Sequence, residues 1–526
     1  MRYIYSIIKA DYLQRTRSYA FLITLAVTIY AAYSFVPPPT ANYTTLNVPG
    51  YRAVFNSAWV GHLSAIMTSV MLSLYGFFLV NTGIKKDIDT EVGLIIATTP
   101  ITNFGYLLSK LISNFLVLLT IAGCTFLVSI GMFFLRSTGY PFHIADFVLP
   151  YLLFVVPALF FISALAIVAE VFLGKYSIVQ YVLFIFLFGV ITGGISSNKG
   201  NTPVVFIDPY GVSTMTTSIK NTINTQFHEN IKEVSFGFIF GEKHKVNKTF
   251  LWEGVTWTNI YLFSRVLWIC LGIGLVYLSS FFFHRFDFER PMSKKKKIKS
   301  HEHQHETLTI APAGISRALL PPVVADYGIF PFIKTELLLL VRKGSKWFWL
   351  INAGVFVSMI FVPLDIAHAY ILPVLWFLQV TRWSELATKE KTNRLHYFTY
   401  SSYKPLQRML PAQILAGVIL AVALALPIIV RYLIALDIYS VINIFGGAIF
   451  IVLLAVCLGI ISGGKKLFEI IFFILTYAAI EKIPVTDYLG GVSHGSHSGY
   501  MATILMLIVF LGLISFSVRN YQSRHL

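Results

Sequence analysis

Charged side chains are scarce in this sequence. Asp, Glu, Lys and Arg make up 12% of its 526 residues, whereas hydrophobic residues make up 56%. Soluble domains carry about 25% charged residues, and a soluble protein this apolar would expose large patches that promote aggregation. The composition therefore excludes a large water-soluble protein and indicates a chain that crosses a membrane several times.

Several motifs are also missing. The ten-residue alternating strands of outer-membrane barrels do not recur along the chain, so the predicted fold class is an all-α polytopic membrane protein. No GxxxxGK[ST] loop is present. We therefore expect no nucleotide or other cofactor bound by this chain, no catalytic residues and no enzyme activity of its own.

Cysteine is rare, and a secretory signal is not expected. Cys124, Cys270 and Cys457 lie inside apolar stretches, which is typical of packing residues and not of a disulfide or metal framework. Charged residues interrupt the apolar residues of the first 21 positions, and no small-residue cleavage site follows them. No metal site is predicted.

Long apolar runs, by contrast, recur along the whole chain, and about twelve can form membrane-spanning helices. The first six are predicted near residues 20–36, 58–82, 111–134, 148–172, 177–195 and 258–283. The second six are predicted near residues 347–363, 366–382, 411–432, 440–462, 466–482 and 500–518. The even number places both termini on the same side of the membrane.

The basic residues are concentrated in one set of loops. The formal net charge is +17, and the positive-inside rule explains it without a nucleic-acid partner. The residues on the basic side are Arg2, Lys9, Arg15, Arg17, Lys85, Lys86, Lys110, Arg382, Lys389, Lys391, Arg394, Lys404 and Arg408. This distribution predicts a multi-pass protein of the inner or plasma membrane, with both termini and the loops 85–110 and 384–410 in the cytoplasm.

The spans and loops divide the chain into three parts. Residues 1–284 form a first six-span half, in which 196–257 are an external loop long enough for a small ordered unit. Residues 285–326 form a cytoplasmic linker that is basic, then His-rich, then Pro-rich, a composition typical of a flexible connector. Residues 327–526 form the second six-span half.

The two halves resemble each other in sequence, which predicts an internal duplication. Around the first span of each half, Lys9 aligns with Lys334 and Asp11 with Glu336. Further on, DTEVGLIIATTP at 89–100 aligns with KTNRLHYFTYSS at 391–402. The apolar and basic residues of 1–18 also suit an amphipathic helix at the inner interface, and we expect a counterpart before the seventh span. A cytosolic helical tail is the alternative.

The most informative loop is KKDIDTEVGLIIATTP at 85–100, between the second and third predicted spans. Its acidic residues suit a helix start, Leu94 and its neighbours provide an apolar face, and Thr98-Thr99-Pro100 predicts the helix end. Such a short amphipathic helix can dock on another protein. An ordinary solvated loop is the alternative from the residues alone.

This loop, together with LLSKLIS after it, resembles the coupling-helix segment of ABC-2 type permeases, the membrane subunits of ABC exporters. FIDPYGVSTM at 206–215 and YLFSRVLW at 261–268 resemble members of that family with two six-span halves in one chain. The resemblance implies a permease subunit of an ATP-driven exporter, gated by separate ABC ATPase subunits that use ATP and Mg. Membrane lipid and an unidentified transported substrate are the other expected partners.

The resemblance also implies which residues contact the ATPase. In the first half they are Asp87, Asp89, Thr90, Glu91, Leu94, Thr98, Thr99 and Pro100. In the second half they are Glu390, Thr392, Asn393, Arg394, Ser401 and Ser402. The second copy departs from the pattern, because Leu395 replaces Gly93 and Ser402 replaces Pro100, so its docking is expected to be altered or directed at a different partner surface.

Other polar residues remain as alternatives. The histidines at 301, 303 and 305 and those at 494 and 497 lie in polar segments where a loose metal contact competes with a plain linker or turn. Glu170 and Glu469 lie near inner span ends and are expected to face an interface or the pore. The alternative functions are a 12-span secondary transporter driven by an ion gradient and a membrane-embedded enzyme. The substrate, and whether one chain or two form the pore, stay open.

Overall fold

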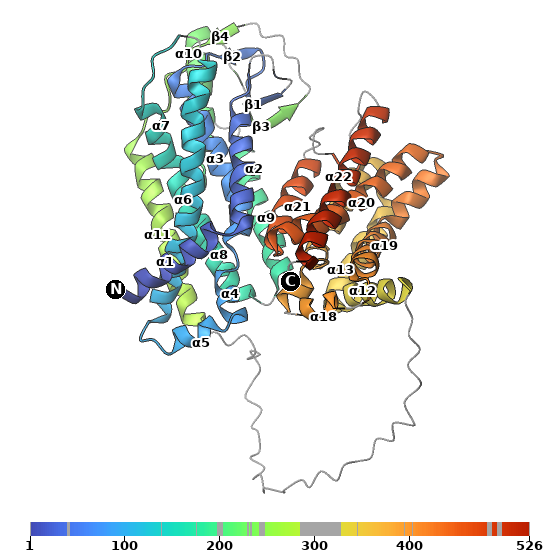
Figure 1. The fold of residues 1–526 in the computed structure, drawn as a ribbon. Helices are drawn as coiled ribbons and strands as arrows, with labels where there is room; N and C mark the ends of the chain where they lie inside the picture. Colours follow the sequence, from blue (N-terminus) through green and yellow to red (C-terminus); the bar gives the residue numbers. More distant parts are fainter. Residues whose placement is uncertain are drawn as a thin grey trace, which may run out of the picture.

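We describe a computed structural model of the protein. It describes residues 2–38, 41, 43–137, 139–174, 176–196, 204–228, 231, 234–240, 248–283, 328–344, 346–393, 395–401, 403–480, 487–491 and 497–524. Figure 1 shows two groups of helices side by side, one built from residues 2–283 and one from residues 328–524. We call these groups the first half and the second half. The predicted linker 285–326 lies outside the described residues.

The first half is mainly helical. Its helices are α1 (Arg2–Thr16), α2 (Tyr19–Phe35), α3 (Ser57–Val80), α4 (Gly83–Asp89), α5 (Val92–Ala97), α6 (Asn103–Arg136), α7 (Ala145–Pro150), the π-helical turn η1 (Tyr151–Val155), α8 (Val156–Leu173), α9 (Ser177–Ser196), α10 (Val212–Phe227) and α11 (Asn259–Phe282). Asn56, Thr102 and Thr258 accept a backbone hydrogen bond at the starts of α3, α6 and α11, and this capping fixes where these long apolar helices begin.

The second half is also mainly helical. Its helices are α12 (Phe330–Arg342), α13 (Lys346–Phe361), α14 (Leu364–Ile366), the π-helical turn η3 (Ala367–Ile371), α15 (Leu372–Phe377), α16 (Val380–Trp383), α17 (Lys389–Thr392), α18 (His396–Tyr400), α19 (Pro405–Ile434), α20 (Ile438–Ser462), α21 (Lys466–Ile480) and α22 (His497–Arg524). Each of the twelve apolar runs predicted from the sequence therefore coincides with helical structure.

The number of full-length spans is smaller than predicted. Eight helices of the described residues are long and apolar enough to cross a membrane, or up to ten if each of two bent helix pairs is one span. The remaining predicted spans, near 366–382 and 466–482, correspond to the short apolar stretch Leu364–Phe377 and to the 15-residue helix α21. The chain is thus a polytopic helical membrane protein.

The two bent pairs occupy corresponding places in the two halves. Helices α1 and α2 meet at 68°, and α12 and α13 meet at 97°. Helix α1 packs on α6 and α12 packs on α19, while α8 packs on α11 and α20 packs on α22. In both halves, therefore, the helix before the first predicted span contacts the helix at the third predicted span, and the helices at the fourth and sixth predicted spans contact each other.

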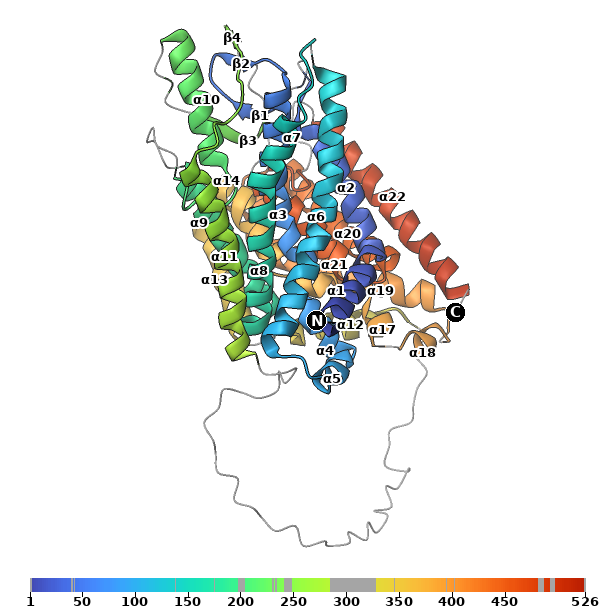
Figure 2. The same cartoon turned by 90° about the vertical axis from the view of Figure 1, so that its left-hand side faces the viewer.

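The first half also has a small β-containing layer at one end, which the sequence did not predict. Strand β1 (Tyr43–Asn47) pairs antiparallel with β3 (Ser235–Phe240), and β2 (Tyr51–Ala53) pairs parallel with β4 (Lys248–Phe250). The strands join the predicted external loop to the loop between α2 and α3. Figures 1 and 2 place them, with α10, at the end of the molecule opposite α5 and α18.

Aromatic packing connects this layer to the spans below it. The ring of Trp59 in α3 lies edge-on to Trp252, with centroids 5.9 Å apart. The imidazole of the buried His62 stacks on Trp257 at 5.8 Å. Asn56 donates a 2.6 Å hydrogen bond to the Trp252 carbonyl. These contacts connect the residues around Trp252 and Trp257 to the start of α3.

A similar backbone turn occurs in each half, before α10 in the first half and before α22 in the second. Asp208 accepts hydrogen bonds from the amides of Tyr210 and Gly211 at 2.9 and 2.8 Å. Asp487 accepts from the amides of Leu489 and Gly490 at 3.0 and 2.9 Å. Gly211 and Gly490 both have positive φ, 87° and 72°, which glycine adopts without strain. We name the pair the two Asp turns.

The second Asp turn packs directly on α20. A Cβ atom at Gly447 would lie 2.5 Å from the Tyr488 carbonyl oxygen, whereas at Gly446 the nearest atom, in the Ile504 side chain, would lie 3.5 Å away. The absence of a side chain at Gly447 is therefore what allows this approach.

These two neighbouring glycines give a matched test. Gly447→Ala should lower stability by about 1–3 kcal/mol, because overpacking outweighs the better helix propensity of Ala. Gly446→Ala should be neutral or stabilising by up to about 1 kcal/mol. Thermal unfolding of both variants in detergent, followed by tryptophan fluorescence, measures the difference. Equal stability of the two variants would show that the turn does not pack on α20 in this way.

Candidate functional site

The loop between the second and third predicted spans forms two short helices at one end of the molecule (Figure 1). We call residues 83–102 the first connecting segment. Helix α4 ends at Asp89, Glu91 has a left-handed backbone with φ 60°, and α5 follows at an angle set by that turn. The predicted helix with its end at Thr98 is confirmed as α5, while the acidic residues Asp87 and Asp89 belong to the separate helix α4.

Helix α5 exposes apolar side chains. Leu94 and Ile95 are 64% and 68% exposed, and Val92 is 42% exposed, whereas Gly93 is buried. Thr98 and Thr99 donate hydrogen bonds to the carbonyls of Ile95 and Ile96 and thereby end the helix. Among the predicted contact residues, the side chains of Asp89, Thr90, Glu91, Leu94, Thr98 and Pro100 are exposed, and that of Thr99 is half-buried.

Asp87 behaves differently, because it is buried. Lys110 of α6 contacts both Asp87 of α4 and Asp11 of α1 at 2.7 Å. Tyr106 of α6 donates a further 2.7 Å hydrogen bond to Asp87. We call these four residues the first acid–lysine cluster. Asp87 is thus an internal support of the connecting segment, and the exposed residues around α5 are the ones available to a partner.

Two further contacts hold α4 and its neighbouring helices in position. Glu170, at the end of α8, accepts a 2.6 Å hydrogen bond from the amide of Ile84 at the start of α4. This satisfies one of the amides that a helix start leaves without a partner. Arg15 of α1 donates to Asn114 of α6. Helix α4 is therefore connected to α1, α6 and α8 by buried polar contacts.

The corresponding segment of the second half has the same plan. We call residues 389–404 the second connecting segment; it contains α17 and α18. Leu395, Tyr397 and Phe398 are 51%, 65% and 78% exposed. The predicted residues Thr392, Asn393 and Ser401 are exposed, whereas Arg394 and Ser402 lie outside the described residues.

Buried charges also support the second connecting segment, and Glu390 is one of them. Lys389 of α17 forms an ion pair with Glu336 of α12. Glu390, 4% exposed, accepts a 2.6 Å hydrogen bond from Gln413 of α19 and lies 3.5 Å from Arg519 of α22. Burial raises the pKa of Glu390. We call these five residues the second acid–lysine cluster, and Glu390 supports the segment from inside.

The sequence alignment places the two clusters in corresponding positions. Asp11 aligns with Glu336, and the register that aligns Thr90 with Thr392 also aligns Asp87 with Lys389. In the first half the cation comes from α6 and joins two acids. In the second half the cation comes from the connecting segment itself and pairs directly with the acid of α12. In each half, therefore, buried charges connect the helix before the first predicted span, α1 or α12, to the connecting segment of that half.

No protein-family model matches the chain, and no curated protein or solved structure matches it either. The interpretation of this surface therefore depends on its own geometry and on the resemblance in its sequence.

The two halves meet near the same end of the molecule. Tyr181 of α9 donates a 2.8 Å hydrogen bond to Glu469 of α21, and Lys466 contacts both, at 2.6 and 3.0 Å. The rings of Phe78 in α3 and Phe473 in α21 lie 4.1 Å apart. Glu469 thus faces an interface, one of the two places predicted for it, whereas Glu170 caps α4.

The first and second acid–lysine clusters were not predicted from the sequence. The alignment of Asp11 with Glu336 was the available signal, because an acid that recurs at the same position of two interfacial helices and is buried there needs a cation partner. The identity of that partner, Lys110 in one half and Lys389 in the other, depends on packing between helices. The candidate metal residues His301, His303, His305 and His494 lie outside the described residues, and no group of three potential metal ligands occurs in the part that is described.

Lys110 provides a direct test of the first cluster. Its side chain is 2% exposed, so Lys110→Met leaves two buried carboxylates without their cation. We expect a loss of about 3–5 kcal/mol of stability. The control Lys9→Met removes an exposed lysine from α1 and should change stability by less than about 0.5 kcal/mol. Thermal unfolding in detergent distinguishes them; similar effects of both variants would contradict the cluster.

A third ion-pair group gives a pH test. Glu385, in the turn after α16, contacts Lys343 after α12 and Lys465 before α21. Burial opposes ionisation of Glu385, but attraction by the two lysines outweighs it, so its pKa lies below the ordinary 4.5. A lowered folded-state pKa adds stability above the unfolded pKa, and this stability disappears as pH falls through the folded value.

Glu385→Gln should therefore destabilise the protein by about 1 kcal/mol at neutral pH, after allowance for solvent screening. The difference from the unmodified protein should shrink progressively once the pH falls below about 5. Unfolding temperatures of both proteins between about pH 7 and pH 3.5 test this expectation. A difference that is constant across the whole range would contradict it.

Proposed function

We propose that this chain is the permease subunit of an ATP-driven ABC transporter of the ABC-2 type, and that it acts as an exporter. The observation that carries the proposal is the pair of connecting segments. Each ends in a short helix with exposed apolar side chains, both lie at the same end of the molecule, and each is supported by buried charges (Figures 1 and 2). The sequence resemblance of 85–113 to a coupling-helix segment supports the same conclusion.

In this proposal, the end with α5 and α18 is cytoplasmic, as are both termini, and the chain lies in the inner or plasma membrane. Residues 1–284 and 327–526 are duplicated six-span permease halves, joined by the linker 285–326. Helices α1 and α12 lie at the inner interface, where their bends of 68° and 97° against the following spans suit them. The matching helix contacts and the two Asp turns support the duplication.

The proposed mechanism transmits ATPase movement by rigid-body shifts. Separate ATPase subunits, which bind ATP and Mg, contact Leu94 and its exposed neighbours on α5 and the exposed face of α18. Displacement of α5 moves α4, and the first acid–lysine cluster passes this movement to α1 and α6. Charge pairs are suited to this role because a buried pair is costly to separate. The second cluster connects α17 to α12, α19 and α22 in the same way.

Closure then changes the contact between the halves. Tyr181, Glu469 and Lys466 lie where α9 meets α21, so a relative movement of the halves must rearrange these hydrogen bonds. ATP binding gives the movement direction only if the ATPase pair binds one arrangement of the two halves more tightly than the other.

Docking is tested by replacing exposed apolar residues with a charge. The chain is co-expressed with a candidate ABC ATPase and purified by a tag on the chain. Leu94→Asp and Phe398→Asp should each reduce the co-purified ATPase at least about tenfold, equivalent to about 1.4 kcal/mol, because a charge then lies in the apolar contact. Charge reversal at the exposed Glu91 should reduce transport.

Tyr140→Asp is the matched control. Tyr140 is 37% exposed and lies between α6 and α7, so this variant should retain the ATPase. Each variant is first checked for unchanged unfolding temperature. The proposal fails if no ATPase co-purifies with the unmodified chain and Glu91 reversal leaves transport unchanged.

A further inference from the structure

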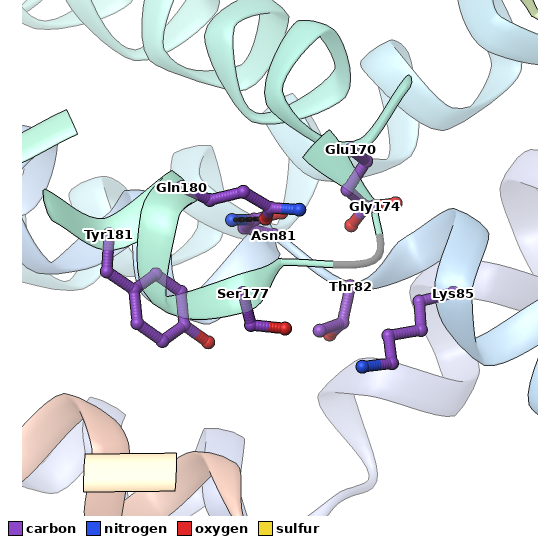
Figure 3. Close-up of a pocket in the computed structure, with 8 residues that line it drawn as sticks. All are labelled: Asn81, Thr82, Lys85, Glu170, Gly174, Ser177, Gln180 and Tyr181. Atoms are coloured by element: carbon purple, nitrogen blue, oxygen red, sulfur yellow. Dashed lines mark hydrogen bonds between the residues drawn. The ribbon is translucent and has the colours of Figure 1, made fainter. Parts of the chain in front are cut away.

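A polar pocket lies beside the first connecting segment, where α3, α8 and α9 approach one another (Figure 3). The space between its lining residues and in front of its mouth is about 250 Å³, and the part that a water-sized group can enter is about 10 Å³. Its residues come from the end of α3, the start of α4, the end of α8 and the start of α9. The docking surface described above does not include this pocket.

The rim of the pocket carries donor groups. Thr82, Lys85 and Ser177 line it and are half-buried, and Figure 3 shows the ends of their side chains turned toward one another. No ion pair to Lys85 is found among the described residues. Ser177 is the first residue of the 20-residue helix α9, whose free amides favour negative charge. An ammonium and two hydroxyls beside a helix start form suitable donors for a phosphate group.

The floor of the pocket has the opposite character, because it offers acceptors. Asn81 is 1% exposed; its amide nitrogen donates to Gln180 at 2.7 Å, while its Oδ1 atom is buried without a hydrogen-bond partner. Gln180 uses its own amide nitrogen on the Leu173 carbonyl at 2.6 Å. Glu170 accepts the Ile84 amide with Oε2, and its Oε1 receives no hydrogen bond from the described part of the chain.

A buried acceptor without a partner costs about 1–3 kcal/mol, so the floor suits a ligand that brings several N–H donors and a positive charge. A primary ammonium has three donors and no acceptor. A quaternary ammonium has no donor, and a hydroxyl carries no charge. The rim and floor together therefore suit a ligand with a phosphate and a primary ammonium close to each other.

The surroundings favour a lipid as the source of this ligand. Val179, Val182 and Leu183 of α9 are 48%, 44% and 54% exposed, and by their helical spacing they lie on the face of α9 opposite the pocket residues Ser177, Gln180 and Tyr181. The pocket lies at the ends of three candidate spans. A polar pocket at the ends of spans lies at the level of the lipid headgroups, so a lipid of the adjoining leaflet can reach it with its headgroup.

We propose that the polar pocket binds the headgroup of an aminophospholipid from the adjoining leaflet. The phosphate lies against Lys85, Thr82 and Ser177, and the primary ammonium lies against Glu170 and Asn81. This binding is independent of the proposed transport function. The pocket also shares Glu170 with the start of α4, so an occupied pocket places a ligand directly beside the first connecting segment.

The test uses the purified full-length chain without any ATPase, so its result does not depend on the proposed function. Native mass spectrometry in detergent measures adducts with dioleoyl phosphatidylethanolamine, phosphatidylglycerol and phosphatidylcholine, which differ only in the headgroup. We expect phosphatidylethanolamine to bind about tenfold more tightly than the other two, equivalent to about 1.4 kcal/mol. Equal binding of the three lipids would overturn the proposal.

Variants then assign the preference to the pocket. Glu170→Gln keeps an acceptor for the Ile84 amide but removes the charge, so it should abolish the preference for phosphatidylethanolamine over phosphatidylglycerol. Lys85→Ala, at the half-buried rim, should lower the affinity for both lipids several-fold. This variant tests the pocket if Glu170→Gln does not fold. Lys86→Ala is the control, because Lys86 is exposed and does not line the pocket. An unchanged preference in Glu170→Gln, or unchanged affinities for both lipids in Lys85→Ala, would overturn the assignment.

A soluble competitor distinguishes the two sources of the headgroup chemistry. O-phosphoethanolamine carries the same phosphate and ammonium without acyl chains. If it fails to displace phosphatidylethanolamine at similar concentration, the acyl chains contribute to the binding and the lipid is supported. If it displaces the lipid at similar concentration, the commitment to a lipid is overturned.

Discussion

The buried contact of Lys110 with two carboxylates is the interaction on which the arrangement of the first half depends. An ammonium removed from water is stable only if its charge is compensated nearby, and the same holds for each carboxylate. Lys110 lies on α6, Asp11 on α1 and Asp87 on α4, and both contacts are 2.7 Å long. None of the three helices can move away alone without exposing an unpaired charge to an apolar environment. Position and movement of the first connecting segment are thereby linked to two other helices.

The second half satisfies the same requirement with different residues. Lys389 occupies the position aligned with Asp87 and pairs directly with Glu336 of α12. This pair does not need a cation from α19, the counterpart of α6. Helix α19 contributes the neutral Gln413, which binds the adjacent Glu390. Exchange of an acid for a base at one position therefore changes which helix supplies the cation, while the connection between α12 and α17 is kept. Such compensation explains how two segments with little sequence identity can keep the same support.

The sequence predicted the helical fold well, because membrane spans depend on one strong signal. Every predicted apolar run coincides with a helix, since the backbone must satisfy its hydrogen bonds internally in lipid. The loop near Leu94 was predicted as a helix from its apolar face and its Thr-Pro end, which are local features. The short strands β2 and β4, of three residues each, could not be predicted, because their pairing depends on two loops far apart in the sequence.

The candidate site was predictable only where a local pattern determines exposure. Leu94 is exposed as its position on an amphipathic helix suggested, but Asp87 and Glu390 also lie in polar loops and are nevertheless buried. Loop charge alone cannot distinguish a carboxylate that faces water from one that pairs with a lysine on another span. The second Asp turn was missed for a related reason. Asp208 and Asp487 are each followed by a glycine three positions later, but the two residues between differ, and the common hydrogen-bond pattern appears only in three dimensions.

Glu170 connects the two proposals through one side chain. Its Oε2 atom accepts the amide that begins α4, and its Oε1 atom belongs to the floor of the polar pocket. A ligand ammonium beside this carboxylate and a displacement of α4 act on the same group. If movement of α5 by an ATPase changes the position of Ile84, the affinity of the pocket must change as well. Thermodynamic linkage then requires the reverse effect: a headgroup that binds one position of α4 more tightly also shifts the affinity for the ATPase, by the same factor.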